Sequence, residues 1–282
     1  MTRLDPAWLD AQYNNRARIP EHPAILKRWA DASAAAYAAS DVRLNLRYGD
    51  GAGEALDVFA PSVSGAPVLV YLHGGYWRAL GKHDQAFVAP PFVQAGAMVV
   101  LVDYALCPTV SIEHIVLQTV RALVWVHRHA PRYGGDARRI VVAGHSAGGH
   151  LAAMLLACRW PQVAAGLPPR LVHGAVSVSG LYDLEPLRHA PFLAADIRLD
   201  AASAARLSPA LMPPPDGRLV SVVGADESEE FLRQNALIRS AWGERCVSVC
   251  ETIPRRHHMD VLDELVLPAA GLHRAARNLL AL

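Results

Sequence analysis

The 282-residue chain lacks the features that mark several classes of protein. Its 27 Lys and Arg residues are balanced by 26 Asp and Glu residues, so it has no basic surplus for nucleic acid or an acidic membrane surface. No apolar run reaches the roughly 18–20 residues that cross a bilayer. The segment 1–16 carries charges and Asn where a signal peptide needs an apolar stretch. We therefore expect a cytoplasmic protein with no nucleic-acid or membrane partner.

Cysteine is also scarce. The four cysteines form no C-x-x-C pair and no metal-ligand spacing, which indicates free thiols in a reducing compartment: Cys107, Cys158, Cys246 and Cys250. Hydrophobic residues make up 52% of the chain and charged residues 19%, a composition that excludes intrinsic disorder. The length suits one large domain or two small ones.

Short Val-rich runs bounded by Gly or Pro have the pattern of strands buried on both faces, and they fall at residues 67–72, 97–102, 139–143, 172–178 and 219–223. Helix-like stretches lie before, between and after them, at residues 22–39, 111–129, 146–158, 229–242 and 260–280. This alternation predicts an α/β fold with a mainly parallel sheet covered on both faces.

The N-terminal part of the sheet has a different pattern. Residues 42–48 alternate apolar and polar side chains, as a half-buried strand does, and residues 55–59 are expected to pair with them as an antiparallel edge across the Gly-rich turn. Residues 181–216 break the rhythm with several prolines. We expect one domain over residues 1–282, with an N-terminal arm at 1–20 and a cap-like insertion at 181–216 above one end of the sheet.

The first chemical signal is Gly144-His145-Ser146-Ala147-Gly148, between a predicted strand and a predicted helix. A nucleophile on such a sharp turn has a strained backbone and needs small neighbours, which Gly144, Ala147 and Gly148 provide. The turn also sets Ser146 near a helix N-terminus, whose N–H groups stabilise an anion. The alternative is an ordinary Gly-rich turn between strand and helix.

The second signal is His73-Gly74-Gly75-Tyr76-Trp77, directly after the strand at 67–72. Acyl transfer needs donors aimed at the oxygen that becomes negative in the transition state. Adjacent glycines let backbone N–H groups approach that oxygen. We expect Gly75 and Ala147, with Gly74 as a third candidate, to form this oxyanion hole. The alternative, a turn that merely closes a strand, is disfavoured by the order of the two motifs.

These motifs resemble the α/β-hydrolase fold, and more narrowly the serine-dependent arylformamidase (kynurenine formamidase) branch with its bacterial esterase relatives. The resemblance extends from about Tyr13 to Leu265 and includes the runs Tyr13-Asn14-Asn15-Arg16, His73-Gly74-Gly75-Tyr76-Trp77-Arg78, residues 144–151, residues 180–187 and Phe231-Leu232-Arg233-Gln234. It implies a Ser-His-acid triad and an acyl-enzyme intermediate.

The acid of such a triad follows a late strand and precedes the histidine. In the family it stands before a Ser and a short segment ending in Phe, so counting back from Phe231 selects Glu227, with Asp226 as the alternative. Glu229 and Glu230 are expected at a solvated helix N-terminus, where negative charge is favoured.

The base follows the last predicted strand, at residues 247–253, where His257 and His258 are adjacent. Neighbouring side chains cannot both face Ser146. The family's base precedes an aromatic residue and then Asp or Asn, which selects His258, although Met259 replaces the aromatic residue. Asp260 is expected to cap the closing helix, with His257 at the rim.

We expect Tyr76, Trp77 and His145 at the substrate pocket, with Trp77 alternatively packed beneath the oxyanion loop. The pair His127 and His129 has no third ligand nearby in sequence, so neither a metal nor another cofactor is expected.

The resemblance implies hydrolysis of an aryl formamide such as N-formylkynurenine. A carboxylesterase acting on short-chain or aryl esters or carbamates is the close alternative, and an inactive binding protein the remote one. The partner is a small-molecule ester or amide. The oligomeric state stays open, with a homodimer as one option.

Overall fold

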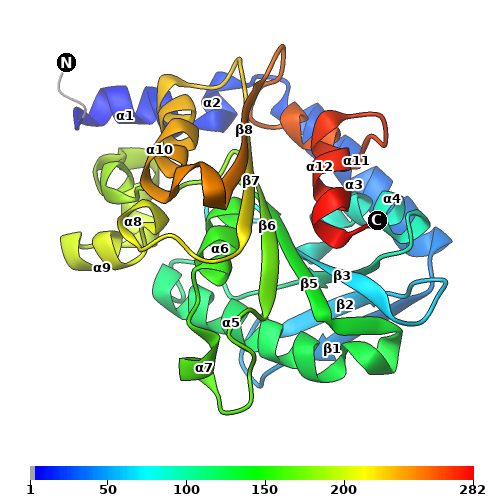
Figure 1. Cartoon of the computed structure of the whole chain (residues 1–282). Helices are drawn as coiled ribbons and strands as arrows, with labels where there is room; N and C mark the ends of the chain where they lie inside the picture. The colour runs from blue at the N-terminus through cyan, green and yellow to red at the C-terminus, as the bar shows by residue number, and fades with distance from the viewer. Residues whose placement is uncertain (1–3) are drawn as a thin grey trace.

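The computed structural model describes residues 4–282. One sheet of eight strands runs through the molecule (Figure 1). The strands are β1 (Val42–Arg47), β2 (Ala55–Phe59), β3 (Ala66–Leu72), β4 (Met98–Val102), β5 (Gly135–His145), β6 (Val172–Val178), β7 (Arg218–Gly224) and β8 (Val247–Ile253). Each predicted strand is therefore present, with small shifts at its ends.

The sheet has the expected direction of strands. Its order is β1-β2-β4-β3-β5-β6-β7-β8. The pairs β1/β2 and β2/β4 are antiparallel, and the other five are parallel. This confirms a mainly parallel sheet with an antiparallel N-terminal edge. Because parallel strands end at the same edge, the loops that follow β3, β5, β7 and β8 meet there.

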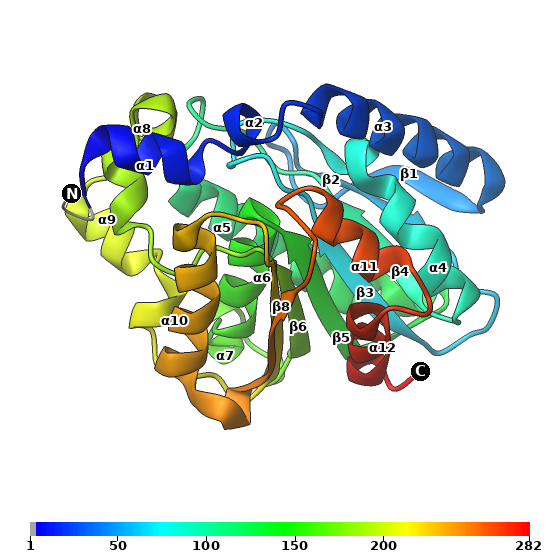
Figure 2. The same cartoon turned by 90° about the horizontal axis from the view of Figure 1, so that it is seen from above.

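Helices cover both faces of the sheet (Figure 2). The α-helices are α1 (Pro6–Tyr13), α2 (Asn15–Arg18), α3 (His22–Ala39), α4 (Ala89–Gln94), α5 (Ile112–His129), α6 (Ala147–Leu156), α7 (Trp160–Val163), α8 (Pro191–Ile197), α9 (Ala201–Arg206), α10 (Glu229–Cys246), α11 (Asp263–Val266) and α12 (Gly271–Leu280). Figure 2 shows α5, α6 and α10 on one side of the sheet and α3, α4, α11 and α12 on the other. None of the helices in residues 4–282 is both long and apolar enough to cross a bilayer.

Side chains of the central strands pack into two separate hydrophobic cores, one on each face of the sheet. On β3, Val68 and Val70 pack into the core beneath α5 and α6, whereas Leu69 and Tyr71 pack into the core beneath α3, α4 and α12. Alternate residues of a strand face opposite sides of a sheet, so a continuous apolar run buries both faces. None of the four cysteines is in a disulfide in the described chain.

Two local predictions are wrong. The stretch 260–280 is not one helix: a short 3₁₀ turn (Asp260–Leu262), α11 and α12 follow one another, with a break before α12 that contains Pro268. A proline removes a helical hydrogen bond and disfavours helix in the residue before it.

Strand β1 is not half-buried, because a register shift between Arg43 and Leu46 breaks the alternation and leaves Leu44 56% exposed. Asn45, inside this bulge, has a φ of +53°.

Two segments outside the central sheet pack against each other. Residues 181–216 contain α8 and α9, and Phe192 at the start of α8 donates its N–H to Asp10 of α1 over 3.0 Å. The arm predicted at 1–20 extends partly outside the described residues, since only its residues from 4 onward are covered. Its described part includes α1 and α2.

Candidate active site

Ser146 stands on the sharp turn between β5 and α6. Its φ of 57° and ψ of −117° are strained for a residue with a side chain. The turn tolerates only small neighbours: a Cβ on Gly144 would lie 2.2 Å from the Gly148 carbonyl oxygen, and one on Gly148 would lie 2.0 Å from that of Leu72. The local sequence thus forces the hydroxyl out of the sheet at the N-terminus of α6.

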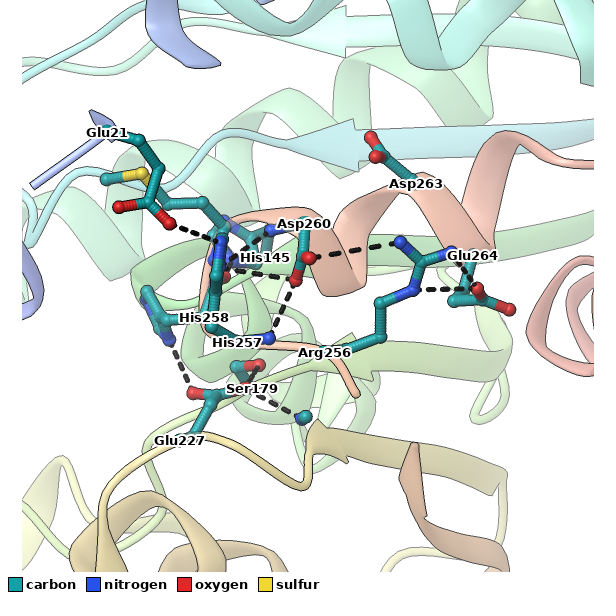
Figure 3. Close-up of polar contacts among 12 residues, drawn as sticks. Glu21, His145, Ser179, Glu227, Arg256, His257, His258, Asp260, Asp263 and Glu264 are labelled. Atoms are coloured by element: carbon teal, nitrogen blue, oxygen red, sulfur yellow. Dashed lines mark hydrogen bonds and ion pairs between the residues drawn. The ribbon is translucent and has the colours of Figure 1, made fainter. Parts of the chain in front are cut away.

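His258 follows β8 and lies between Ser146 and Glu227. Its Nε2 is 3.1 Å from the Ser146 Oγ. Its Nδ1 is 2.7 Å from the Glu227 Oε2, as Figure 3 shows. The ring packs against Phe231, with 4.4 Å between centroids. All three side chains of the serine, histidine and acid are buried. Because Nδ1 faces a carboxylate, it carries the proton, which leaves Nε2 free to accept one from the serine.

Glu227 has three hydrogen-bond donors around a fully buried carboxylate. Besides His258, the Gly224 N–H donates to its Oε1 over 2.8 Å, and the Ser179 hydroxyl donates to the same oxygen. Asp226 is exposed, and among residues 4–282 only its backbone has a partner, the Arg256 carbonyl at 2.9 Å. The sequence offered two candidates for the acid, and they differ in where their carboxylates lie. Glu227 faces His258, whereas Asp226 faces solvent.

His257 is turned away from the serine. Its Nδ1 accepts hydrogen bonds from the backbone N–H groups of Met259 at 3.1 Å and Asp260 at 3.2 Å, and its Nε2 lies 3.5 Å from the Glu21 carboxylate (Figure 3). The predicted capping role of Asp260 is wrong in direction. Its carboxylate accepts from the N–H of His257, upstream, because residue 260 already belongs to the 3₁₀ turn.

The loop after β3 supplies backbone donors beside the serine. Gly75, Tyr76 and Trp77 all have positive φ, at 102°, 52° and 57°, which curls the chain tightly. The N–H groups of Gly75, Tyr76 and Ala147 have no partner among residues 4–282. Gly74 differs from the expectation, because its N–H donates to the Gln85 Oε1 over 3.2 Å and is already occupied.

A cavity opens above these groups. Its lining combines apolar and aromatic side chains with polar ones, and it includes residues of the N-terminal arm, of the loop after β3 and of the loop after β8: Asn14, Asn15, Arg16, Leu26, Trp29, Gly75, Tyr76, Arg78, Ala79, Leu80, Gln85, His145, Ser146, Phe192, His258 and Met259. Tyr76 and His145, which were expected at the substrate pocket, line this cavity. Trp77 does not line it and takes the alternative position: it is fully buried beneath the loop and packs edge-on against His150, with 5.0 Å between centroids.

His145 is a neutral polar residue of the cavity wall. Burial, with the nearby His258, lowers the pKa of its imidazole to about 3. Its Nε2 donates to the His258 carbonyl oxygen over 2.7 Å, so its Nδ1 is an unprotonated acceptor. This contact ties His145 to the backbone of the loop that carries His258.

The arm closes one side of the cavity, which the sequence did not indicate. The Tyr76 hydroxyl donates to the Tyr13 carbonyl oxygen, and the Tyr13 hydroxyl donates to the Glu230 carboxylate, each over 2.7 Å. Glu230 is therefore not solvated as predicted: it is buried and also accepts from Arg233 over 2.8 Å. The Tyr13–Arg16 run marked this segment in the sequence, but nothing in it revealed that Tyr13 has partners 63 and 217 residues away.

The charged side chains of the cavity are both arginines. No Asp or Glu of the described chain lines the cavity, whose charged side chains are Arg16 and Arg78. Arg78 is paired with Asp196 of α8. Residues 4–282 contain no group of three or more His, Cys, Asp or Glu side chains placed to hold a metal ion.

Comparison with protein families and with other proteins shows which family this chain resembles. The family model described as the alpha/beta hydrolase fold matches residues 69–228. The kynurenine formamidase of Salmo salar is 33% identical over 235 residues, covering 79% of this chain and 76% of that protein. The esterase LipC of Mycobacterium tuberculosis is 33% identical over 151 residues, covering 51% of this chain and 38% of that protein.

Solved structures agree as well. A putative thioesterase from Silicibacter sp. TM1040 has a TM-score of 0.83 at 31% identity, covering 94% of this chain and 97% of that one. An esterase from Pyrobaculum calidifontis, at 19% identity, has a TM-score of 0.71 with 92% of each chain covered and shares the fold. The chain belongs to the α/β-hydrolase family, in the group that contains the kynurenine formamidases.

Proposed function

We propose that this protein is a serine hydrolase that cleaves an aryl formamide such as N-formylkynurenine. The observation that carries the proposal is the hydrogen-bond chain from Ser146 through His258 to Glu227 beside an aromatic-lined cavity. The choice of substrate is supported by the similarity, over 79% of the chain, to a protein named kynurenine formamidase. The partner is a small molecule, and the free thiols suit a cytoplasmic location.

The reaction begins with transfer of the Ser146 proton to the His258 Nε2 as the serine oxygen attacks the formyl carbon. Glu227 holds the imidazole in the required tautomer and stabilises the imidazolium. His258 then donates this proton to the leaving arylamine, and a formyl ester of the serine remains. Water attacks the ester by the same steps in reverse, releasing formate and the free serine.

The tetrahedral intermediate carries a negative oxygen that needs donors. The N–H groups of Gly75 and Ala147 are unpartnered and are our choice for this hole, with the N–H of Tyr76 as a further donor. We leave Gly74 out of the donor set, because its N–H already binds Gln85.

The cavity wall suits an aromatic leaving group with polar substituents. Trp29, Tyr76 and Phe192 supply aromatic surface. Asn15 is only 6% exposed and its Nδ2 lacks a partner among residues 4–282, so it can donate to a substrate carbonyl or carboxylate. Arg16 adds positive charge with no carboxylate in the wall to oppose it.

Ester hydrolysis is the second candidate function. It is favoured by the similarity to the esterase LipC over 151 residues and by the structural match to a putative thioesterase. One triad can cleave amides, esters and thioesters, since each passes through the same kind of oxyanion. The choice between them depends on how the cavity holds the leaving group.

A side-by-side rate comparison tests the proposal. Purified protein is assayed with N-formyl-L-kynurenine, an aryl acetate and an aryl thioacetate, with Ser146→Ala as the blank. A formamide kcat/KM of about 10⁴ M⁻¹s⁻¹ or more supports formamide hydrolysis, since enzymes reach that range on their own substrates. Fast ester turnover with negligible formamide turnover assigns a carboxylesterase instead. No turnover, and no labelling of Ser146 by a serine-directed phosphonate, leaves an inactive binding protein.

A further inference from the structure

Gln85 lies beneath the oxyanion loop and is fully buried. It belongs to the 3₁₀ segment η1 (Lys82–Val88), at a point where the backbone leaves helical geometry with φ −124° and ψ 22°. Its Oε1 accepts two hydrogen bonds, from the Tyr71 hydroxyl at 2.9 Å and from the Gly74 N–H at 3.2 Å. Gln85 thus joins the end of β3 to the first glycine of the oxyanion loop.

The orientation of the Gln85 amide is determined by its partners. A backbone N–H can only donate, so the atom that faces Gly74 is the amide oxygen. Burial raises the pKa of Tyr71, so its hydroxyl keeps its proton and donates to the same oxygen. The amide nitrogen, Nε2, then has no partner among residues 4–282. Gln85 also borders the active-site cavity. The contacts that the structure shows for its side chain are both made by the oxygen, so the oxygen is the atom on which the inference depends.

The hydrogen bond from Gly74 bears on the direction of the next N–H group. The Gly74 carbonyl oxygen lies 2.8 Å from the His73 Nδ1, and the Gly75 carbonyl oxygen accepts from Arg78 at 3.1 Å and Ala79 at 3.0 Å. In a trans peptide the C=O and the following N–H point in opposite directions. The contact to the Gly74 C=O therefore sets the direction of the Gly75 N–H in the same peptide, and the contact to the Gly74 N–H holds the peptide that precedes it.

We propose that Gln85 is a positioning residue of the oxyanion hole. Through the Gly74 N–H it holds the His73–Gly74 peptide, which sets the position of the following Gly74–Gly75 peptide and so of the Gly75 N–H that faces the developing oxyanion, and it acts through this backbone rather than on the reacting atoms. The inference rests on the proposed serine-hydrolase function, but not on a formamide being the substrate. A glutamine that merely filled space would make no such difference to the transition state.

The test compares Gln85→Met with Tyr71→Phe in the full-length protein, using whichever ester or amide the wild type turns over. Both positions are almost completely buried and belong to the same hydrogen-bond chain. Only Gln85→Met removes the acceptor of the Gly74 N–H, so Tyr71→Phe is the matched control. We expect Gln85→Met to lower kcat by about 10–100-fold with KM within about threefold, and Tyr71→Phe to stay within about threefold of the wild type. Equal losses in the two variants, or an unchanged kcat in Gln85→Met, would overturn the proposal.

An inhibitor measurement separates positioning from general damage. An aryl boronate forms a tetrahedral adduct with the serine and uses the oxyanion hole, whereas the product arylamine or phenol does not. Gln85→Met should weaken the boronate by the same factor as kcat and leave the affinity for the product unchanged. Parallel weakening of both ligands contradicts the inference.

The same measurements distinguish this inference from the proposed function. If Gln85→Met does not fold, as thermal unfolding would reveal, Gln85→Asn replaces it, because an amide one methylene shorter cannot reach Gly74 from the same backbone. Wild-type turnover with a normal Gln85 variant rejects the positioning role alone. A wild type without any turnover or boronate adduct rejects both proposals.

Discussion

Replacing Glu227 by Gln is the change that tests the site most directly. The substitution keeps the size of the side chain and removes its charge. The amide oxygen can still accept from Gly224 and Ser179. The amide nitrogen then faces the His258 Nδ1, now 2.7 Å from a carboxylate oxygen. Two N–H donors cannot share a hydrogen bond, so the imidazole is driven to the tautomer with its proton on Nε2, where it cannot accept the serine proton.

The expected loss follows from this tautomer. Changing the acid of a serine triad to its amide lowers kcat by roughly 10³–10⁴, because the geometry survives and only the proton is misplaced. We expect that factor for Glu227→Gln with KM nearly unchanged. Asp226→Asn is the matched control, one residue away in the same loop, exposed and with no side-chain partner in the described chain. Its kcat should stay within about threefold of the wild type.

The assay is steady-state hydrolysis of an aryl acetate and of N-formyl-L-kynurenine, with thermal unfolding of each variant as the check on folding. If the two variants lose the same activity, or if Asp226→Asn loses more, the assignment of the acid is refuted. A Glu227→Gln protein that is fully active but less stable would mean that the carboxylate only supports the loop.

Three further predictions concern the rest of the site. Ser146→Ala and His258→Ala should each lower kcat by roughly 10⁵–10⁶, whereas His257→Ala keeps most activity in the same assay; comparable losses at both histidines would contradict the geometry. Gly75→Ala should lower kcat by about 10²–10³, because its Cβ would lie 2.1 Å from a carbonyl oxygen at a φ of +102°; wild-type rates would exclude this N–H from the hole. Burial lowers the pKa of His150 from 6.5 to about 4, so the folded state favours the neutral ring and stability falls as the pH drops from about 6.5 towards 4. His150→Gln should flatten this dependence in denaturant titrations between those pH values, and an unchanged slope would contradict it.

Much of the fold follows from local patterns. The Val-rich runs became the central strands because continuous apolar segments bounded by Gly or Pro suit a sheet buried on both faces. The strand-turn-helix around Ser146 follows from its small neighbours, since larger ones would clash with backbone oxygens. The break before α12 has a local cause too, because Pro268 removes a helical hydrogen bond and disfavours helix in the residue before it.

The candidate triad came from spacing and from family resemblance, and its catalytic role remains a prediction. The residue pattern of the family that the chain resembles favoured Glu227 over Asp226 and His258 over His257. What separates each pair in space is burial: Glu227 is enclosed by donors and Asp226 is exposed. In a loop, side chains do not follow the regular periodicity of a helix or a strand. The sequence therefore does not show which of two adjacent residues faces inward.

The tertiary structure alone decided the surroundings of the site. Ser179 approaches Glu227 from 48 residues away, Gln85 occupies the N–H of Gly74, and Tyr13 reaches Glu230 across 217 residues to seat the arm beside the cavity. These contacts join elements through space, and neither periodicity nor a motif links their partners along the chain. The sequence by itself determined the layers of the fold, the strained serine turn and the glycine loop, because these features depend on steric limits between residues that are close together along the chain. Which polar groups are occupied, which stay free and what closes the cavity depend on how distant segments pack.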